Sequence, residues 1–174
     1  GQSPYINSNA ALNAPKLTTD VKVNAPTAAV ANNDVADGTE DTQLLISTAD
    51  LLSNDTDADA ASDGDVLSVF SVGNASHGSV RLLNDGHIEF TPEANFHGEA
   101  GFDYVVTDTF GATSQAHVTL TVNAVNDAPV VQNTNVQATE DLAIEWQASE
   151  LLANASDVDT ATDGQTLSLD SVSH

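Results

Sequence analysis

The sequence predicts an all-β chain: an antiparallel Greek-key β-sandwich of about seven strands, repeated in tandem about every hundred residues. Two observations carry this prediction. Apolar residues alternate with polar ones at a period of two in several short segments separated by turn signals, as in half-buried strands. In addition, 33–72 matches 133–172 without a gap and with 16 of 40 positions identical, so one repeat has the size of a common single domain.

The chain of 174 residues is expected to contain three parts. Residues 1–24 are the tail end of a preceding repeat or a linker, because 20–24 resembles 119–123. Residues 25–126 form a complete sandwich, and 127–174 form the first, incomplete half of the next repeat, which contains no counterpart of 78–123. Proline stiffens both joints, Asn24-Ala25-Pro26 and Asn126-Asp127-Ala128-Pro129. We therefore expect the chain to be a piece of a longer protein.

Within the complete repeat, one short helical turn is predicted from Thr48 to Asn54, with Thr48 as its N-cap. The strands that follow are marked by alternating apolar residues. Turn signals at 84–86, 97–98 and 110–111 separate these strands. Phe70 aligns with Asp170 in the second repeat, so it is expected on the wetter face of its strand. The alternating sets are Val80/Leu82, Ile88/Phe90, Phe102/Tyr104/Val106 and Val118/Leu120/Val122.

The incomplete repeat poses a physical problem, because its inward residues have no partner strands within its own sequence. Trp146 aligns with Ile46 and is therefore expected to be a core residue. Two alternatives stay open at this point: the segment is poorly ordered, or it exchanges strands with another copy of the chain, as open sheet edges invite. Concentration-dependent association is expected in the second case.

The charge balance restricts the possible partners. The chain has 26 acidic residues and 3 basic ones, and a formal net charge of −23. Such a surface repels phosphate backbones and anionic lipids, so no nucleic-acid partner and no membrane insertion are expected. The chain contains no cysteine, which excludes disulfides and thiolate metal sites. Cations are the expected partners, and a bound metal would take the place of a disulfide staple.

The acidic residues are concentrated in one loop, with six aspartates between Asp50 and Asp65. Neighbouring carboxylates repel each other, and a divalent cation reverses the sign of that interaction. Calcium suits the loop because it accepts six to eight oxygen ligands in a flexible geometry. An EF-hand beginning at Asp55 fails, since Ala60 and Val66 stand where glycine and glutamate are required. The remaining ligands must therefore come from elsewhere in the fold, with Glu40-Asp41, Asp108 and Asn126-Asp127 as candidates.

Several motifs in one order then resemble a known family. Ile88-Glu89-Phe90-Thr91-Pro92, Asn95-Phe96-His97-Gly98 and 102–108, with the joint at 126–129, are similar to the cadherin-like tandem repeats of giant bacterial RTX/VCBS-type adhesins. The resemblance implies a calcium-binding cadherin/Ig-like sandwich in an extracellular bacterial surface protein. It also implies export by a type I secretion system and a role as a calcium-rigidified extender in cell adhesion or biofilm formation. The implied partners are neighbouring repeats and a host or bacterial cell-surface ligand.

In such arrays calcium lies between successive domains, and the resemblance assigns ligands accordingly. Glu40, Asp57, Asp59, Asp108, Asn126 and Asp127 match the family's positions in the first repeat, and Glu140, Asp157 and Asp159 match them in the second. Asp55 and Asp65 become Ala155 and Gln165, so they are expected to be additional ligands of the first repeat only. The full set of Ca²⁺ candidates is Glu40, Asp41, Asp55, Asp57, Asp59, Asp63, Asp65, Asp108, Asn126, Asp127, Glu140, Asp141, Asp157, Asp159 and Asp163.

Other functions fit the sequence less well. A solvated acidic turn is the simplest alternative for the aspartate-rich loop. A non-catalytic ligand- or carbohydrate-binding or spacer domain of a secreted enzyme is the second functional hypothesis, although one Trp and two Tyr offer little surface for stacking on sugars. The sequence contains no recognisable catalytic constellation, so the chain is not expected to be an enzyme.

Overall fold

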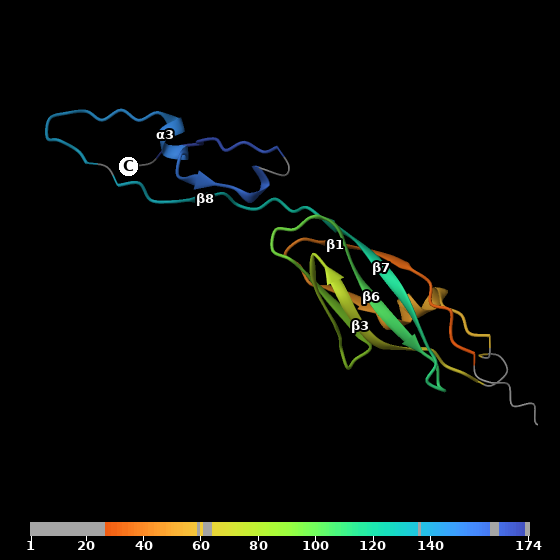
Figure 1. Cartoon of the computed structure of the whole chain (residues 1–174). Helices are drawn as coiled ribbons and strands as arrows, with labels where there is room; N and C mark the ends of the chain where they lie inside the picture. The colour runs from red at the N-terminus through yellow and green to blue at the C-terminus, as the bar shows by residue number, and fades with distance from the viewer. Residues whose placement is uncertain (1–26, 59, 61–63, 136, 161–163, 173–174) are drawn as a thin grey trace, which may run out of the picture.

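The computed structural model describes residues 27–58, 60, 64–135, 137–160 and 164–172. The predicted tail at 1–24 lies outside these residues. Two units follow one another along the chain, a complete sandwich and a smaller second unit beyond the end of β7 (Thr113–Asn123) (Figure 1). In the described part of the chain, no helix is long and apolar enough to cross a membrane.

The first unit is a seven-stranded sandwich, which confirms the predicted all-β fold class. One sheet has the order β1 (Asp34–Thr39), β7, β6 (Gly98–Thr107) and β3 (Ser68–Ser76). The other has the order β2 (Leu44–Ser47), β5 (His87–Pro92) and β4 (Gly78–Leu82). The pairing departs from the expected antiparallel pattern at one place, because β1 runs parallel to β7.

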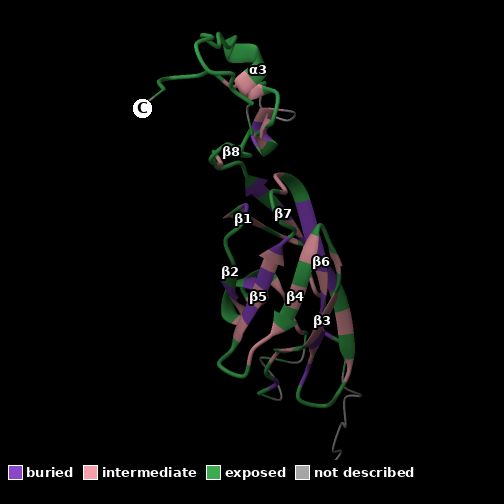
Figure 2. Cartoon of the chain, turned by 90° about the vertical axis from the view of Figure 1, so that its left-hand side faces the viewer, coloured by how far each residue is buried: buried purple, intermediate pink, exposed green. Residues whose placement is uncertain are grey.

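The core lies between the two sheets, where buried residues alternate along β5, β6 and β7 (Figure 2). This alternation confirms the period of two read from the sequence. Phe70 is 67% exposed, as expected from its alignment with Asp170. The largest fully buried side chains are Tyr104, Phe90, Phe102, Ile88, Leu120, Val106 and Val118.

The predicted helical turn is present as α1 (Thr48–Leu51), which continues into the 3₁₀ turn η1 (Leu52–Asn54). The N-cap is Ser47 rather than Thr48, because the Ser47 hydroxyl accepts a hydrogen bond from Ala49 N–H. The Thr48 hydroxyl instead donates to the carbonyl oxygen of Gly86. Leu51 faces the core at 3% exposure, and the turn leads directly into the aspartate-rich loop.

The second unit reproduces the beginning of the first at an offset of one hundred residues. Its strands β8 (Val130–Val131) and β9 (Ala155–Ser156) pair antiparallel, and the first unit has the bridge Val30–Thr56 at the equivalent place. The helix α3 (Ala148–Leu152) corresponds to α1, and a 3₁₀ turn η2 (Val158–Thr160) follows β9. The internal repeat of the sequence is therefore also a repeat of local structure.

Most of the second unit is exposed (Figure 2), and its exposed residues include several large apolar ones. Trp146 is 40% exposed and Ile144 is 44% exposed, whereas the equivalent Ile46 of the first unit is 8% exposed. The expectation that Trp146 is a core residue is therefore wrong. The physical reason is that Ile46 lies on β2 and pairs with β5, and no described strand of the second unit corresponds to β5.

Candidate metal centre

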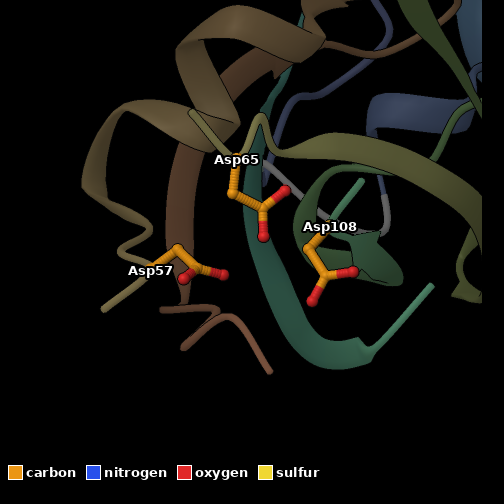
Figure 3. Close-up of side chains that lie close together, drawn as sticks. All are labelled: Asp57, Asp65 and Asp108. Carbon is orange, nitrogen blue, oxygen red and sulfur yellow. The ribbon is translucent and has the colours of Figure 1, made fainter. Parts of the chain in front are cut away.

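A compact group of carboxylates lies at the end of the sandwich that contains the turn between β6 and β7. We call Asp57, Asp65 and Asp108 the distal site (Figure 3). One carboxylate oxygen from each of the three lies within 4.8 Å of the others. Among the described residues, no other group of three or more His, Cys, Asp or Glu side chains meets in this way. The 11 residues of β7 separate this end from the joint by roughly 35 Å.

Asp108 is positioned by the tight turn that follows β6. Its Oδ1 accepts hydrogen bonds from the N–H groups of Phe110 and Ala112, both at 2.8 Å. Gly111 has φ +89°, which a glycine adopts at no steric cost, and its N–H donates to the Asp108 carbonyl. The turn therefore fixes the Asp108 side chain before any ligand is present.

Asp65 precedes β3 and is held by the same turn. Its Oδ1 accepts hydrogen bonds from Thr109 N–H at 2.7 Å and from Val66 N–H at 2.9 Å. Hydrogen bonding by Thr109, through its hydroxyl and its backbone N–H, lowers the pKa of Asp65 below its ordinary value. Asp65 is thus held ionised at neutral pH although it is only 8% exposed.

The second oxygens of these carboxylates provide the decisive observation. Asp65 Oδ2 and Asp108 Oδ2 are buried and have no hydrogen-bond partner. Both residues are more than nine-tenths buried, and their side chains converge with that of Asp57 (Figure 3). A buried unsatisfied carboxylate oxygen is costly, whereas a divalent cation between the three groups would satisfy it. The distal site therefore fits an oxygen-coordinated divalent metal ion.

A second set of acidic residues lies where the two units meet. We call Glu40, Asp41, Asp127, Asp157 and Asp159 the joint site. Glu40 follows β1 and is 2% exposed, and its Oε1 accepts a hydrogen bond from Val125 N–H at 2.6 Å. His97 Nδ1 lies 3.7 Å from Glu40 Oε2. Glu40, which follows β1, therefore binds the segment that follows β7.

The linker carboxylate Asp127 connects the two units at the joint site. Asp127 N–H donates to Asp159 Oδ2 at 2.7 Å, and Asp159 N–H donates to Asp157 Oδ1 at 3.0 Å. Burial raises the pKa of Asp127, and the negative charges of Asp41, Asp159, Glu40 and Asp157 raise it further. Asp127 Oδ2 is also buried without a hydrogen-bond partner. A small cleft of about 290 Å³ adjoins Asp127 and Asp157.

Asp55, a predicted ligand, lies in a different environment. Its Oδ1 accepts a hydrogen bond from Asn32 N–H at 2.7 Å, and both of its carboxylate oxygens are 3.4 Å from the Tyr104 hydroxyl. The same hydroxyl lies 2.8 Å from Asp34 Oδ2. Asp55 is therefore not part of the distal group but of a network that holds the segment before β1.

The remaining predicted ligands are distributed as follows. The side-chain amide of Asn126 donates to the carbonyl oxygen of Asp127, so it is used locally. Glu140 and Asp141 are exposed in the second unit. Asp59, Asp63 and Asp163 lie outside the described residues. The ligands that the resemblance assigned to one kind of site are thus divided between the two ends of the sandwich, with Asp57 and Asp108 at one end and Glu40 and Asp127 at the other.

The sequence did not predict two features of the structure around these carboxylates. The backbone N–H groups of 109, 110 and 112 orient the distal carboxylates, and backbone donors leave no signal in a sequence. Asp34 accepts hydrogen bonds from the Tyr104 hydroxyl and from the side-chain amide of Asn54, and the sequence did not predict either contact. The sequence held a signal for the second contact, because Asn54 recurs as Asn154, which donates to Thr134 at the equivalent place.

A match to a protein family agrees with this fold. The cadherin-like domain family matches residues 23–123, which is more than half of the chain. A comparison with curated proteins found no match.

Similar solved structures include two endo-fucoidan hydrolases of glycoside hydrolase family 107, MfFcnA4 and MfFcnA9. They are 20% and 18% identical, cover 60% and 55% of this chain, and have TM-scores of 0.38 and 0.33. A nucleoside hydrolase-related hypothetical protein from Saccharophagus degradans is 16% identical, covers 57% of this chain and has a TM-score of 0.35. The matches span 16% of each fucoidan hydrolase and 26% of the third protein.

TM-scores below 0.5 support no statement about activity, so the assignment depends on the family match and on the sandwich itself. The chain therefore belongs to the cadherin-like domain family.

Proposed function

We propose that this chain is a non-catalytic, calcium-binding extender module of an extracellular bacterial surface adhesin. The observation that carries the proposal is the distal site, where Asp65 and Asp108 each use one oxygen to accept backbone hydrogen bonds and present the other, buried and unpaired, to Asp57. Such an arrangement of carboxylates is costly when empty and favourable around a cation.

The chemistry of the donors favours calcium over other metals. The distal site offers only carboxylate oxygens, which suit hard cations, and no cysteine or histidine belongs to it. Magnesium requires a near-ideal octahedron, whereas calcium accepts an irregular set of six to eight oxygens completed by water. The aspartates of the site lie on a loop and a turn, which can supply such an irregular set.

Calcium would act on the array through its charge. At the distal site it removes the repulsion among Asp57, Asp65 and Asp108. At the joint site it neutralises carboxylates from both units, which fixes the angle between successive domains. A row of such joints would form a stiff rod that presents a terminal adhesive domain away from the cell. The match to the cadherin-like family and the concentration of acidic residues at the ends of the sandwich support this function.

Thermal unfolding with calcium and with chelator tests the proposal. Extracellular calcium modules have dissociation constants of roughly 0.1–1 mM. At a free calcium concentration ten times the dissociation constant, each independent site adds about 1.4 kcal/mol to the free energy of unfolding. Magnesium at the same concentration is the control for ionic strength and is expected to have a smaller effect. An unfolding midpoint that stays constant across millimolar calcium would contradict the proposal.

A further inference from the structure

The two ends of the complete sandwich obtain their carboxylates from different places. At the downstream end the joint supplies Asp127, which lies between the units. At the upstream end the sequence has no acidic residue from 21 to 33, and Thr27 stands one hundred residues before Asp127. Conversely, the loop of the first unit has Asp65 where the loop of the second has Gln165. The upstream linker thus has Thr27 in place of Asp127, and the sandwich that follows it has Asp65 in place of Gln165.

The three carboxylates of the distal site all belong to the sandwich. Asp57 follows η1, Asp65 precedes β3, and Asp108 follows β6. The hydrogen bonds that orient Asp65 and Asp108 come from Val66, Thr109, Phe110 and Ala112, all within the same unit. Among the residues that the structure describes, all three ligands and these four orienting residues belong to the first unit.

The joint site has the opposite construction. Glu40 and Asp41 come from the first unit, Asp127 from the linker, and Asp157 and Asp159 from the second unit. Its hydrogen bonds also cross the boundary, since Asp127 N–H donates to Asp159. A cation at this site depends on the linker and on both units.

We propose that Asp65 makes the distal site self-contained: the complete sandwich binds a divalent cation at its upstream end with its own ligands, independently of the joint. This inference rests on the proposed calcium function and adds to it a division of roles. The joint site couples successive units, whereas the distal site links Asp57, Asp65 and Asp108 within one unit.

Two substitutions that exchange each residue for its repeat counterpart separate the sites. Asp65→Gln places the residue of the second unit in the first, and Asp127→Thr places the upstream linker residue in the downstream joint. Calcium titration calorimetry on the whole chain measures the number and affinity of the binding events. Asp37→Asn, an exposed acid on β1, is the matched control for loss of one charge. Thermal unfolding in chelator checks that each variant is folded.

A second readout reports the geometry of the joint. The chain has no cysteine, so Ser79→Cys in the first unit and Ser168→Cys in the second give two unique positions for spin labels. Both serines are exposed. The distribution of the distance between the labels measures how freely the units move with respect to each other, with and without calcium.

We expect Asp65→Gln to remove one binding event and to leave the calcium-dependent change in the label distance as in the wild type. We expect Asp127→Thr to retain that event with an affinity within about twofold of the wild-type value, because distant sites without shared partners act independently. An unchanged stoichiometry in Asp65→Gln, or an equal loss of the event in Asp127→Thr, would overturn the inference while leaving the calcium function intact. Absence of any calcium binding to the wild type would overturn both.

Discussion

The backbone N–H of Thr109 donates a hydrogen bond to Oδ1 of Asp65 over 2.7 Å and joins two loops that are 44 residues apart in the sequence. Thr109 directly follows Asp108, so the same turn positions both buried carboxylates of the distal site. The bond leaves Asp65 Oδ2 buried and unpaired. The carboxylates are therefore oriented by the fold itself, and a cation that binds there meets ligands already in place.

Asp108→Asn is expected to remove the calcium-dependent stabilisation contributed by the distal site. The amide oxygen can still accept the hydrogen bonds from Phe110 and Ala112, but the charge that attracts the cation is lost. At calcium tenfold above the dissociation constant, the gain in unfolding free energy should fall by about 1.4 kcal/mol. Chemical denaturation in calcium and in chelator measures the difference.

The chelator arm is the internal control for Asp108→Asn. Loss of charge-assisted hydrogen bonds and relief of repulsion from Asp57 and Asp65 act in opposite directions, each by about 1 kcal/mol. Wild type and variant should therefore differ little without calcium. An equal calcium gain in both proteins would show that Asp108 is not a ligand.

Acidification of the metal-free protein is expected to stabilise the joint. The pKa of Asp127 is raised above its ordinary value of 3.8 by burial and by Asp41, Asp159, Glu40 and Asp157. The folded joint therefore binds a proton more tightly than the unfolded chain does. The stability gained from this tighter proton binding is fully present below the ordinary pKa of Asp127, and it is lost as pH rises through the raised pKa.

Fluorescence of Trp146, the sole tryptophan, follows denaturation of the second unit in chelator. The unfolding midpoint should rise as pH falls from neutral to about 4.5. Calcium should remove this trend, because the cation neutralises the same carboxylates that the proton would. Asp127→Asn, which cannot titrate, should weaken the trend, and a midpoint that falls steadily on acidification of the wild type would contradict the expectation.

Much of the fold could be predicted from the sequence because strand alternation is a local property. The inward residues Ile88, Phe102 and Val118 are fully buried, and each belongs to a set with a period of two. The parallel pairing of β1 with β7 could not be predicted, since pairing depends on how distant segments pack. The N-cap lies one residue before the predicted Thr48, because the Thr48 hydroxyl donates to the carbonyl oxygen of Gly86, which lies 38 residues away.

The sequence predicted which residues are candidate ligands, but it did not predict where in the fold these residues lie. The aspartate-rich loop pointed to Asp57 and Asp65, since carboxylate clusters leave a compositional signal, and Asp108 was a candidate from the family resemblance. These signals could not show that Glu40 lies at the opposite end of the sandwich, because that follows from the direction of β1 beside β7. Asp55 has the same residue type and loop as Asp57, and its contacts with Asn32 N–H and the Tyr104 hydroxyl give it a different role.

The second unit is expected to make the chain associate as its concentration rises. Leu142, Ile144 and Trp146 are 68%, 44% and 40% exposed, and they alternate along one extended segment. The same unit also has an apolar groove of about 350 Å³, which is lined by Val131, Leu151, Leu167 and other residues of this unit. Exposed apolar surface of this kind favours self-association through a second copy.

Light scattering over a wide concentration range measures this association. Added salt should strengthen it, because screening weakens the repulsion between two highly negative copies. A chain ending at Ala128 lacks the exposed segment and is the matched control. A constant monomeric mass for the full chain, at low and at high salt, would rule the association out.

Tyr104→Phe is expected to destabilise the sandwich by about 1–2 kcal/mol, the usual effect of leaving a partly buried acceptor without its donor. Tyr104 is fully buried, and its hydroxyl lies 2.8 Å from Asp34 Oδ2 and 2.9 Å from the Asn32 carbonyl oxygen. Burial and the hydrogen bond to Asp34 raise the pKa of Tyr104, so the hydroxyl remains a donor at all accessible pH values. Urea denaturation at neutral pH measures the change.

The double variant with Asp34→Asn distinguishes this hydrogen bond from simple loss of packing. Burial raises the pKa of Asp34, and the neighbouring Asp55 charge raises it too, while the Tyr104 hydroxyl lowers it. Removing the hydroxyl therefore leaves the partly desolvated Asp34 carboxylate without the hydrogen bond that most stabilises its ionised form. Asp34→Asn removes that charge, so Tyr104→Phe should cost less in the Asp34→Asn background than in the wild type. Equal costs in both backgrounds would assign the effect of Tyr104→Phe to packing or to the Asn32 contact instead.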